Sequence, residues 1–343
     1  MKKRAVQIRP AFEKFNSTFQ KRMHSNGFTL IELGVVMAIV AVLFAILLPA
    51  LAGSKVNSQV FQCLENTRRL TLAWRMYAED NSDLMVYSSD DGNGTAYATT
   101  ATGSHINNLY AWTWSKMDFN GANGFDWDTN ADITLRPLWP YVKVTTAYKC
   151  PADASQITIS SLPAGYTGTY TNGSVVPRIR SYSMNFYLGG IGGNTAFEND
   201  GPAGSSENPK DYPWYFKLTD LGNPGKAPGL IQTFVFVEER SDCINWGAYF
   251  TDMSGYPVPP STKPNVALYQ FTQDMPASYH NYAGCLSFAD GHAEIHRWHD
   301  LVVLQPLAPN GTLLNSGRLG GTTFADPYGQ DVPYMQNAAT RPH

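Results

Sequence analysis

The stretch GFTLIELGVVMAIVAVLFAILLP, residues 27–49, decides the fold of this 343-residue chain. No charged residue occurs between Leu33 and Ser54. A helix needs about 20 apolar residues to cross the roughly 30 Å hydrocarbon core of a bilayer, and residues Phe28 to Leu48 meet that length. We therefore expect one transmembrane helix here, and no second apolar stretch of this length follows it.

The distribution of charge predicts the orientation of this span. Residues 1–27 carry seven basic side chains and the single acid Glu13, so their net charge is +6. The rest of the chain has a net charge of −9, which gives −3 in total. Basic flanks stay on the cytoplasmic side of a membrane. We expect a cytoplasmic N-terminus in the inner membrane, with everything after residue 50 on the periplasmic side. The near-neutral total gives no reason to expect a nucleic-acid partner.

After Pro49 the sequence becomes amphipathic. Apolar or small side chains recur at steps of three and four residues, which predicts a continued helix to about Asp80. This set comprises Val56, Val60, Cys63, Leu64, Thr67, Leu70, Trp74 and Tyr77. Residues 28–80 would extend about 80 Å at 1.5 Å per residue. Pro49 would kink this helix rather than end it.

From Asn81 onward, short β-branched and aromatic runs alternate with Gly, Asn, Asp and Pro clusters. This pattern predicts a mostly antiparallel β-sheet head with long loops, and hence an α+β fold. The runs are Ile133–Leu135, Val142–Ala147, Ile157–Ile159, Thr233–Val237, Val266–Phe271, Leu286–Ala289 and His292–Trp298. Two stretches low in aliphatic residues, 88–130 and 189–210, are expected to be surface insertions. Residues 305–343 are expected to form a loosely structured tail that straps the head.

The start of the apolar stretch resembles the recognition sequence of type IV prepilins and type II secretion pseudopilins. The resemblance lies in Gly27 followed by Phe28-Thr29-Leu30-Ile31-Glu32. It implies that a prepilin peptidase cleaves after Gly27 and methylates the new N-terminal residue, Phe28. Glu32 and Pro49 then occupy the fifth and twenty-second places of the mature chain, as in that family, whereas Gly34 departs from the more common Leu.

This resemblance also implies a domain organisation. Residues 1–27 would be a leader, 28–81 the N-terminal helix, 82–304 the exported pilin-like head and 305–343 the tail.

Glu32 carries the expected assembly chemistry. A carboxylate within hydrocarbon costs roughly 2.5–3.5 kcal/mol, so an acid there calls for a partner. The resemblance implies that Glu32 pairs with the free α-amino group of Phe28 in a neighbouring subunit, so that both charges are neutralised only on assembly. The alternative is that Glu32 lies close enough to the interface to reach water.

A hairpin is predicted near the C-terminus, because Asp290-Gly291 between two alternating runs is typical of a type I′ turn. His280, nine intervening residues, Asp290-Gly291 and then His292 resemble the C-terminal element of a family of prepilin-like bacterial proteins of uncharacterised function. Residues 149–153, 180–185 and 235–240 agree with that family as well. This resemblance implies architecture rather than activity, and we expect a hydrogen bond from His280 to Asp290 to close the turn.

Two groups of side chains are candidate metal ligands. Residues 126–132 alternate oxygen ligands as calcium loops do, although Ala131 and Pro137 replace the usual Gly and closing Glu. These ligands are Asp126, Asp128, Asn130 and Asp132. Resemblance to major type II pseudopilins, which often bind calcium in a head loop, supports this site; the alternative is a solvated turn.

The second group, on one face of the strand after Gly291, consists of His292, Glu294 and His296. With His280 or His299 as a further ligand it suits zinc; the alternative is a polar face in which the imidazoles stack on Trp298 and Tyr279.

The four cysteines lack the CxxC spacing of a zinc site. An exported head meets an oxidising compartment, in which thiols tend to pair. A Cys63–Cys150 disulfide would pin the helix to the head, and a Cys243–Cys285 disulfide would join two strands.

We expect a structural subunit and not an enzyme. The acids Glu238, Glu239 and Asp242 have no recognisable nucleophile nearby, and neighbours on a strand point to opposite faces. The expected partners are copies of the chain or other pseudopilins, the prepilin peptidase, an inner-membrane assembly platform and the bilayer.

Two alternatives remain. One is a membrane-tethered binding protein or adhesin whose tryptophans stack on glycans. These tryptophans are Trp112, Trp114, Trp127, Trp214 and Trp246. The other is a periplasmic hydrolase with a metal at the His292 face.

Overall fold

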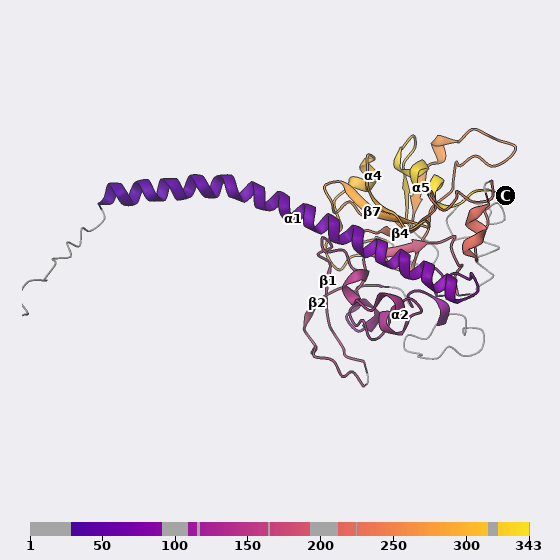
Figure 1. Ribbon diagram of the computed structural model, residues 1–343, viewed down its shortest axis with the longest axis horizontal. Coiled ribbons are helices and arrows are strands. Elements are labelled where there is room, and N and C mark those ends of the chain that lie inside the picture. Colours follow the sequence, from indigo (N-terminus) through magenta and orange to yellow (C-terminus); the bar gives the residue numbers. More distant parts are fainter. Residues whose placement is uncertain are drawn as a thin grey trace, which may run out of the picture. The chain divides into compact units, whose positions relative to one another are not determined.

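The computed structural model describes most of the chain (Figure 1). The described residues are 29–90, 109–114, 117–163, 165–192, 212–223, 225–314 and 322–342, and within them the side chains of residues 47–55 are not described. The expected leader, residues 1–27, therefore lies outside the described residues, as do Phe28 and much of both expected insertions. The chain divides into two units, Met1–Ser54 and Lys55–His343.

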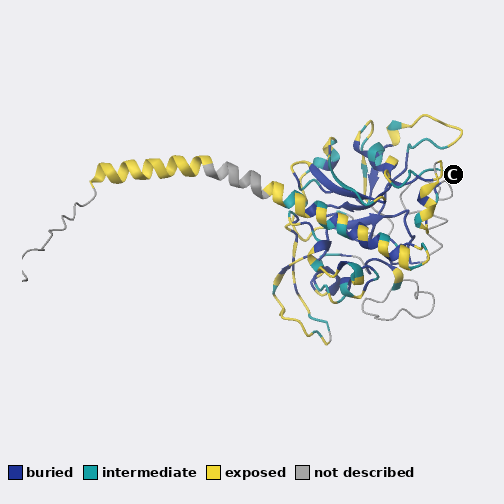
Figure 2. Ribbon diagram, viewed as in Figure 1, coloured by how far each residue is buried: buried dark blue, intermediate teal, exposed yellow. Residues whose placement is uncertain are grey.

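Helix α1, Leu30–Asp80, runs without interruption through Pro49 and ends at the residue that the periodicity predicts. In the first unit, every described residue of α1 is exposed, including all large apolar side chains up to Ile46 (Figure 2). By the usual criteria of length and hydropathy, none of the helices qualifies as a membrane span when the described residues are considered.

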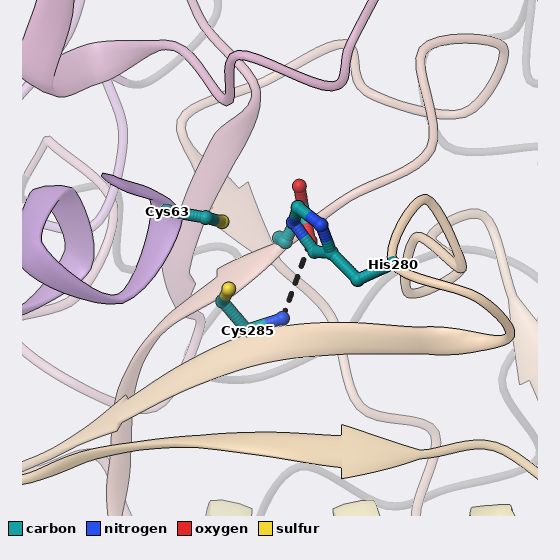
Figure 3. Close-up of side chains that lie close together, drawn as sticks. Cys63, His280 and Cys285 are labelled. Carbon is teal, nitrogen blue, oxygen red and sulfur yellow. Dashed lines mark hydrogen bonds and ion pairs between the residues drawn. The ribbon is translucent and has the colours of Figure 1, made fainter. Parts of the chain in front are cut away.

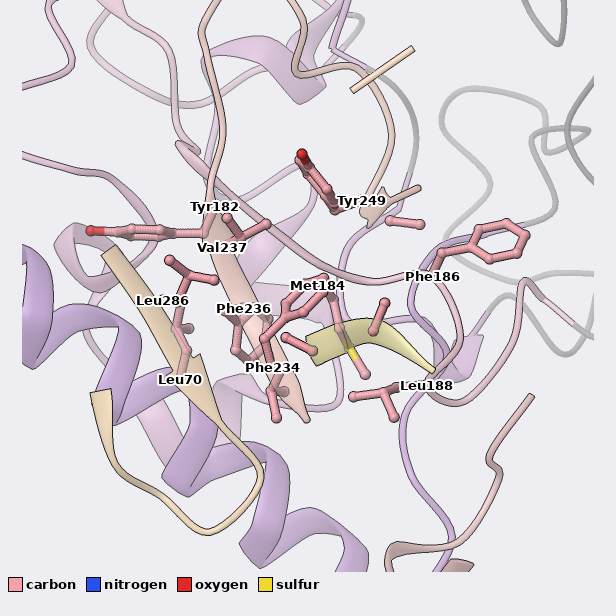
Figure 4. Close-up of a cluster of buried hydrophobic side chains, with 14 of the residues drawn as sticks. Leu70, Tyr182, Met184, Phe186, Leu188, Phe234, Phe236, Val237, Tyr249 and Leu286 are labelled. Atoms are coloured by element: carbon pink, nitrogen blue, oxygen red, sulfur yellow. The ribbon is translucent and has the colours of Figure 1, made fainter. Parts of the chain in front are cut away.

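In the second unit, α1 packs one face into the head. Cys63, Thr67, Leu70 and Trp74 are fully buried, as the amphipathic pattern predicts. Thr71 Oγ1 donates a 2.6 Å hydrogen bond to Ser287 Oγ, which ties the helix to the sheet. The hydrophobic cluster between them contains residues of the helix and of several strands (Figure 4).

The head is built around a five-stranded sheet with the order β5-β3-β4-β7-β8. All neighbouring strands are antiparallel except β3 and β5, so the predicted α+β fold with a mostly antiparallel sheet is confirmed. The strands of this sheet are β3 (Tyr182–Asn185), β4 (Phe234–Glu238), β5 (Ala248–Tyr249), β7 (Ala283–Phe288) and β8 (Ala293–Arg297). β3, β4 and β7 are buried on both faces.

Smaller elements surround this sheet. Two pairs of short strands are β1 (Gln156–Thr158) with β2 (Val175–Pro177), and β6 (Gln270–Thr272) with β9 (Thr323–Ala325). The short helices are η2 (Gly124–Asp126), η3 (Ile133–Leu135), α2 (Trp139–Val142), η4 (Thr145–Tyr148), η6 (Leu218–Gly222), η7 (Val266–Leu268) and α4 (Leu301–Leu304).

Two runs predicted as strands are helical turns instead. Ile133–Leu135 forms η3, and Val142–Ala147 contributes to α2 and η4. The backbone N–H of Leu135 donates to the carbonyl of Asp132, and that of Tyr141 donates to Leu138, so the hydrogen bonds are local. An apolar run this short cannot be assigned from its periodicity, and here local bonds prevail over pairing with another strand.

The C-terminal segment is more ordered than the expected loose tail. Strand β9 pairs with β6, and α5, Asp331–Ala339, buries Val332, Met335 and Ala339. Its start is held by Asp331, whose carboxylate accepts hydrogen bonds from the backbone of His299 and Asp300. The spacing of three and then four residues between these apolar side chains is the helical signal that a sequence rich in loop-forming residues obscured.

The predicted β7–β8 hairpin is present, but its turn is not type I′. Gly291 has a φ of +101°, whereas Asp290 is not among the residues with positive φ. Gly291 N donates to Phe288 O, and Phe288 N donates to His292 O, which describes a three-residue loop with one left-handed glycine. Arg75 of α1 donates to the carbonyl of Asp290 at 2.6 Å and so joins this turn to the helix.

Candidate functional site

The N-terminus of α1 is closed by a reciprocal pair of side chains, Thr29 and Glu32. Glu32 Oε2 accepts hydrogen bonds from Thr29 N at 2.8 Å and Thr29 Oγ1 at 2.9 Å, and Glu32 N donates to Thr29 Oγ1 at 3.2 Å. This is a capping box, which satisfies amide groups that have no partner within the helix. Both of these bonds to the carboxylate end on Oε2. Glu32 can therefore cap its own helix while its other oxygen faces a partner.

The helix after Glu32 is apolar on all sides. Residues 33–46 contain no polar side chain, and their large members are exposed, from Leu33 at 52% to Ile46 at 65%. A helix that is apolar all round is normally buried in protein or membrane. The side chain of Pro49 is not described, and Gly27 and Phe28 lie outside the described residues. A Cβ added at Gly34 would meet no atom within 4 Å, so packing within this chain does not require the small size of this residue.

A second candidate site lies inside the head, where α1 meets the sheet. We call it the thiol cluster, and it consists of Cys63, Cys150, Glu238, His280 and Cys285. Cys63 comes from α1, Glu238 from β4, Cys285 from β7 and His280 from the loop before β7, and their ligand atoms all lie within 4.8 Å of one another. Figure 3 shows the side chains of Cys63, His280 and Cys285 turned toward one another.

Short contacts connect the members of this cluster. His280 Nε2 lies 3.4 Å from Glu238 Oε2 and 3.4 Å from Cys150 Sγ. The backbone N–H of Cys285 donates to Glu238 Oε2 at 3.2 Å. Tyr182 donates its hydroxyl hydrogen to Cys63 Sγ at 3.2 Å. The sheet and the helix thus bring together groups that are more than 200 residues apart in sequence.

Burial controls the protonation of the thiols. It raises the pKa of Cys63 and Cys150 well above the usual value for a thiol, and it raises the pKa of Cys285 to about 11. Burial acts to lower the pKa of His280, but hydrogen bonds to Cys150 and Glu238 outweigh it and raise that pKa to about 10. Without a bound cation, the cluster therefore holds protonated thiols beside an imidazolium.

One polar atom of the cluster has no partner among the described residues. Glu238 is fully buried, and its Oε1 accepts no hydrogen bond. An unsatisfied buried acceptor costs about 1–3 kcal/mol, and more when it is charged. Other buried atoms of the described residues, Glu239 Oε1 among them, share this condition, so what distinguishes the cluster is the convergence of its ligand atoms.

All four cysteines are buried free thiols in the structure. Cys63 interacts with both Cys150 and Cys285, so the predicted neighbours Cys63 and Cys150 do lie together. Cys243 lies outside the thiol cluster, near Asp242 and Glu239. Cys285, predicted as its disulfide partner, lies beside Cys63 instead.

The residues predicted to bind calcium have separate protein partners. Asp126 pairs with Arg178 at 3.2 Å, and Asp132 pairs with Arg136 at 3.1 Å, all four side chains being buried. Asp128 accepts a hydrogen bond from the backbone N–H of Asn130 at 2.9 Å. Within the part of the chain that the structure describes, these carboxylates do not form a converging group of metal ligands. Burial raises the pKa of Asp126 to about 6, although Arg178 acts in the opposite direction.

The face of β8 that carries three polar residues is occupied by aromatic contacts. His292 stacks on Phe288 with ring centroids 4.4 Å apart, and His296 stacks on Tyr334 at 3.5 Å. Glu294 accepts a 2.6 Å hydrogen bond from the hydroxyl of Tyr334. The imidazoles do stack on aromatic rings, but the stacked rings are Phe288 and Tyr334 of α5, whereas Trp298 meets His296 edge-on.

The predicted hydrogen bond from His280 to Asp290 is wrong. Asp290 Oδ1 instead lies 2.6 Å from His292 Nδ1 and accepts the His292 backbone N–H, which stabilises the turn locally. His280 faces the thiol cluster. Gly291 provides the positive φ that the loop requires.

The acids on β4 and after it do point in different directions, as the alternation of a strand predicts. Glu238 faces the thiol cluster, and Glu239 accepts a 2.5 Å hydrogen bond from Ser183. Asp242 pairs with Arg240 at 2.8 Å.

The tryptophans considered for glycan stacking are largely internal. Trp112, Trp114 and Trp127 are buried, and Trp214 and Trp246 are partly buried against the main core.

Sequence reasoning missed the thiol cluster because its members come from separate elements. Only His280 and Cys285, with four residues between them, have a spacing of the kind found in zinc sites, and the other members are remote in sequence. The available signal was a glutamate at the end of the apolar run FVFVE, residues 234–238, in a strand buried at every position. A buried carboxylate needs a partner, and the candidates were His280 and the cysteines.

Comparison with known proteins identifies the N-terminal part of the chain. Residues 22–48 match the family model described as the prokaryotic N-terminal methylation motif. No curated protein and no solved structure matches the chain significantly. The matched motif is consistent with a type IV prepilin-like protein, and it implies a membrane-anchored N-terminus, processing by a peptidase and assembly into a pilin-like multimer. The matched residues do not include the His280–Gly291 element, whose family assignment stays a prediction.

Proposed function

Because this chain carries the N-terminal methylation motif of type IV pilin-like proteins, we propose that it is a structural subunit of a type II secretion or type IV pilus-like filament. The prepilin peptidase cleaves it after Gly27 and methylates Phe28. Before assembly it is a single-pass protein of the inner membrane, with a cytoplasmic N-terminus and a periplasmic head. It is not an enzyme.

The observation that carries this proposal is the composition of α1 in the first unit. One carboxylate, Glu32, precedes a helical surface of exposed apolar side chains that runs as far as residue 46. Such a surface is stable only when lipid or other apolar helices cover it. Transfer from lipid into a bundle of identical helices keeps it covered, so one helix serves both the anchored and the assembled state.

Glu32 provides register in this mechanism. Its Oε2 is engaged by Thr29 of its own chain, which leaves Oε1 for the α-amino group of Phe28 in a neighbouring subunit. Such an ion pair forms only when two helices are staggered so that the amine of one lies beside the carboxylate of the other. The cost of burying each charge is thereby offset only at the correct stagger.

The test compares two variants, Glu32→Ala and Glu65→Ala, by the amount of each that is incorporated into extracellular filaments. Glu65 is a matched control, because it is an exposed acid on the same helix that forms a surface ion pair with Arg69 at 3.7 Å. If the pair contributes about 2.5–3.5 kcal/mol, Glu32→Ala weakens subunit addition roughly 100-fold, whereas membrane insertion is unimpaired. Glu65→Ala should assemble normally. Equal incorporation of both variants would refute the registry mechanism.

A further inference from the structure

The thiol cluster has the composition of a metal site rather than of a core. Buried cysteines alone behave as small apolar residues and need no ligand. Here they surround an imidazole and a carboxylate that are both nearly inaccessible to water. Glu238 Oε1 has no hydrogen-bond partner among the described residues, so this buried carboxylate keeps acceptor capacity that a cation would use.

We propose that the thiol cluster binds one Zn²⁺ ion through four side chains: Cys63, Glu238, His280 and Cys285. Zn²⁺ prefers tetrahedral sets of sulfur, nitrogen and oxygen ligands, and two cysteine sulfurs disfavour Ca²⁺ and Mg²⁺. Binding displaces the thiol hydrogens of Cys63 and Cys285 and the Nε2 hydrogen of His280, which leave as three protons, so that two thiolates, a neutral imidazole and Glu238 face the ion.

The distances suit this coordination. Zn–N and Zn–O bonds of about 2.0–2.2 Å in a tetrahedron place the two ligand atoms about 3.4 Å apart. His280 Nε2 and Glu238 Oε2 are separated by 3.4 Å. The remaining ligand atoms lie within 4.8 Å of one another, and pairs that include sulfur require about 3.5–3.8 Å, so a shift of about 1 Å closes the site.

The surroundings supply the outer shell that metal sites require. Tyr182 donates a hydrogen bond to Cys63 Sγ, and the backbone N–H of Cys285 donates to Glu238 Oε2. Cys150 Sγ lies 3.4 Å from His280 Nε2 as a neighbouring thiol, and this contact gives way to the metal when Nε2 binds it. Hydrogen bonds to the ligands of a metal orient them, and losing such a partner typically costs about 10–100-fold in affinity.

A disulfide is the competing use of the same thiols. Joining Cys63 to Cys150 or to Cys285 would engage two sulfurs and neither the carboxylate nor the imidazole. Zinc engages the carboxylate, the imidazole and two thiols together, and it therefore accounts for four of the five members of the cluster.

The consequence of such a site is mechanical. Its ligands come from α1, β4, β7 and the loop before β7. One ion would link the buried face of α1 to strands β4 and β7 of the head. The inference does not depend on filament assembly, since every ligand belongs to the second unit of a single chain.

The test uses the full-length protein, purified in detergent under reducing conditions and freed of metal with a chelator. Zn²⁺ is returned and the bound metal is measured per chain, with Co²⁺ added in parallel as a spectroscopic probe. We expect one zinc per chain, four titratable thiols after chelation and denaturation, and a Co²⁺ spectrum with tetrahedral d–d bands and thiolate charge transfer.

Two variants complete the test. Cys285→Ser should weaken Co²⁺ binding by about 100-fold or more. Cys243→Ser also removes a buried thiol from the same head, but outside the thiol cluster, and should bind as the unmodified protein does.

Three results would overturn the proposal. The first is that a folded chain with four free thiols binds no metal. The second is that protein isolated from the periplasm without reductant lacks two free thiols, and the third is a Co²⁺ spectrum without thiolate charge transfer. Each is measured on the unmodified chain, so that misfolding of a variant leaves the test intact.

Discussion

The attachment of α1 to the head can be measured by replacing Leu70 with alanine. Leu70 is fully buried within the main core cluster, in which Leu286 of β7 also lies (Figure 4). Buried Leu→Ala changes cost about 2.7–5.0 kcal/mol, since they remove transferred apolar atoms and leave a cavity. We expect Leu70→Ala to lie in this range, because a helix fixed to a sheet has little freedom to collapse into the space.

The expected change in melting temperature follows from the size of the second unit, residues 55–343. At roughly 2.1 cal/mol/K per residue, its unfolding entropy is about 0.6 kcal/mol/K, so Leu70→Ala should lower Tm by about 4–8 °C. Leu72→Ala is the matched control: this leucine is two residues away on the same helix but 57% exposed, and its replacement should change stability by no more than about 0.5 kcal/mol.

The assay is thermal unfolding of the full-length protein in detergent, followed by circular dichroism at one scan rate. If both variants melt at the same temperature, the face of α1 that contacts the sheet has been assigned wrongly.

Two further predictions concern the head. Burial raises the pKa of Asp274 to about 7, so the folded chain keeps a proton that the unfolded chain loses above pH 4. The free energy of unfolding of the unmodified protein therefore falls as pH rises from about 4 to 7. Asp274→Asn lacks this titration, so its free energy of unfolding should rise, relative to that of the unmodified protein, by on the order of 2–4 kcal/mol across that window. Urea denaturation of both proteins at pH 4 and pH 7 measures this difference. Free energies of unfolding that change equally with pH in the two proteins would contradict the prediction. Gly291→Ala should lower the free energy of unfolding by about 1–2 kcal/mol, because the φ of Gly291 is +101°. Gly222→Ala is the control and should cost less, because an added Cβ there meets no atom within 4 Å and φ is not positive. Equal losses of stability in the two variants would show that the turn does not need its glycine.

The helix and the class of the fold could be predicted because their signals are local. Uncharged residues up to Ser54 and the three- and four-residue spacing up to Tyr77 determine α1 without reference to the rest of the chain. Alternating runs such as 292–298 likewise predict a strand of the antiparallel sheet. These patterns depend only on which side of one element is apolar.

The unpredicted features depend on contacts between distant segments. His280 could be assigned to Asp290 from its spacing, but the folded sheet places it beside Cys150 and Glu238. In the same way, Asp126 and Asp132 alternate as calcium ligands do, yet each meets an arginine. A residue's partner is set by the tertiary fold, and no periodicity within one segment reports it.

The central claim is that a leader is removed and that the mature chain begins at a modified Phe28. Mass spectrometry of the N-terminal peptide, in cells with and without the prepilin peptidase, tests this most directly. The account predicts N-methylated Phe28 as the first residue when the peptidase is present, and the intact leader when it is absent. A mature chain that still begins with residues 1–27 in the presence of the peptidase, or one cut after the apolar stretch, would contradict it.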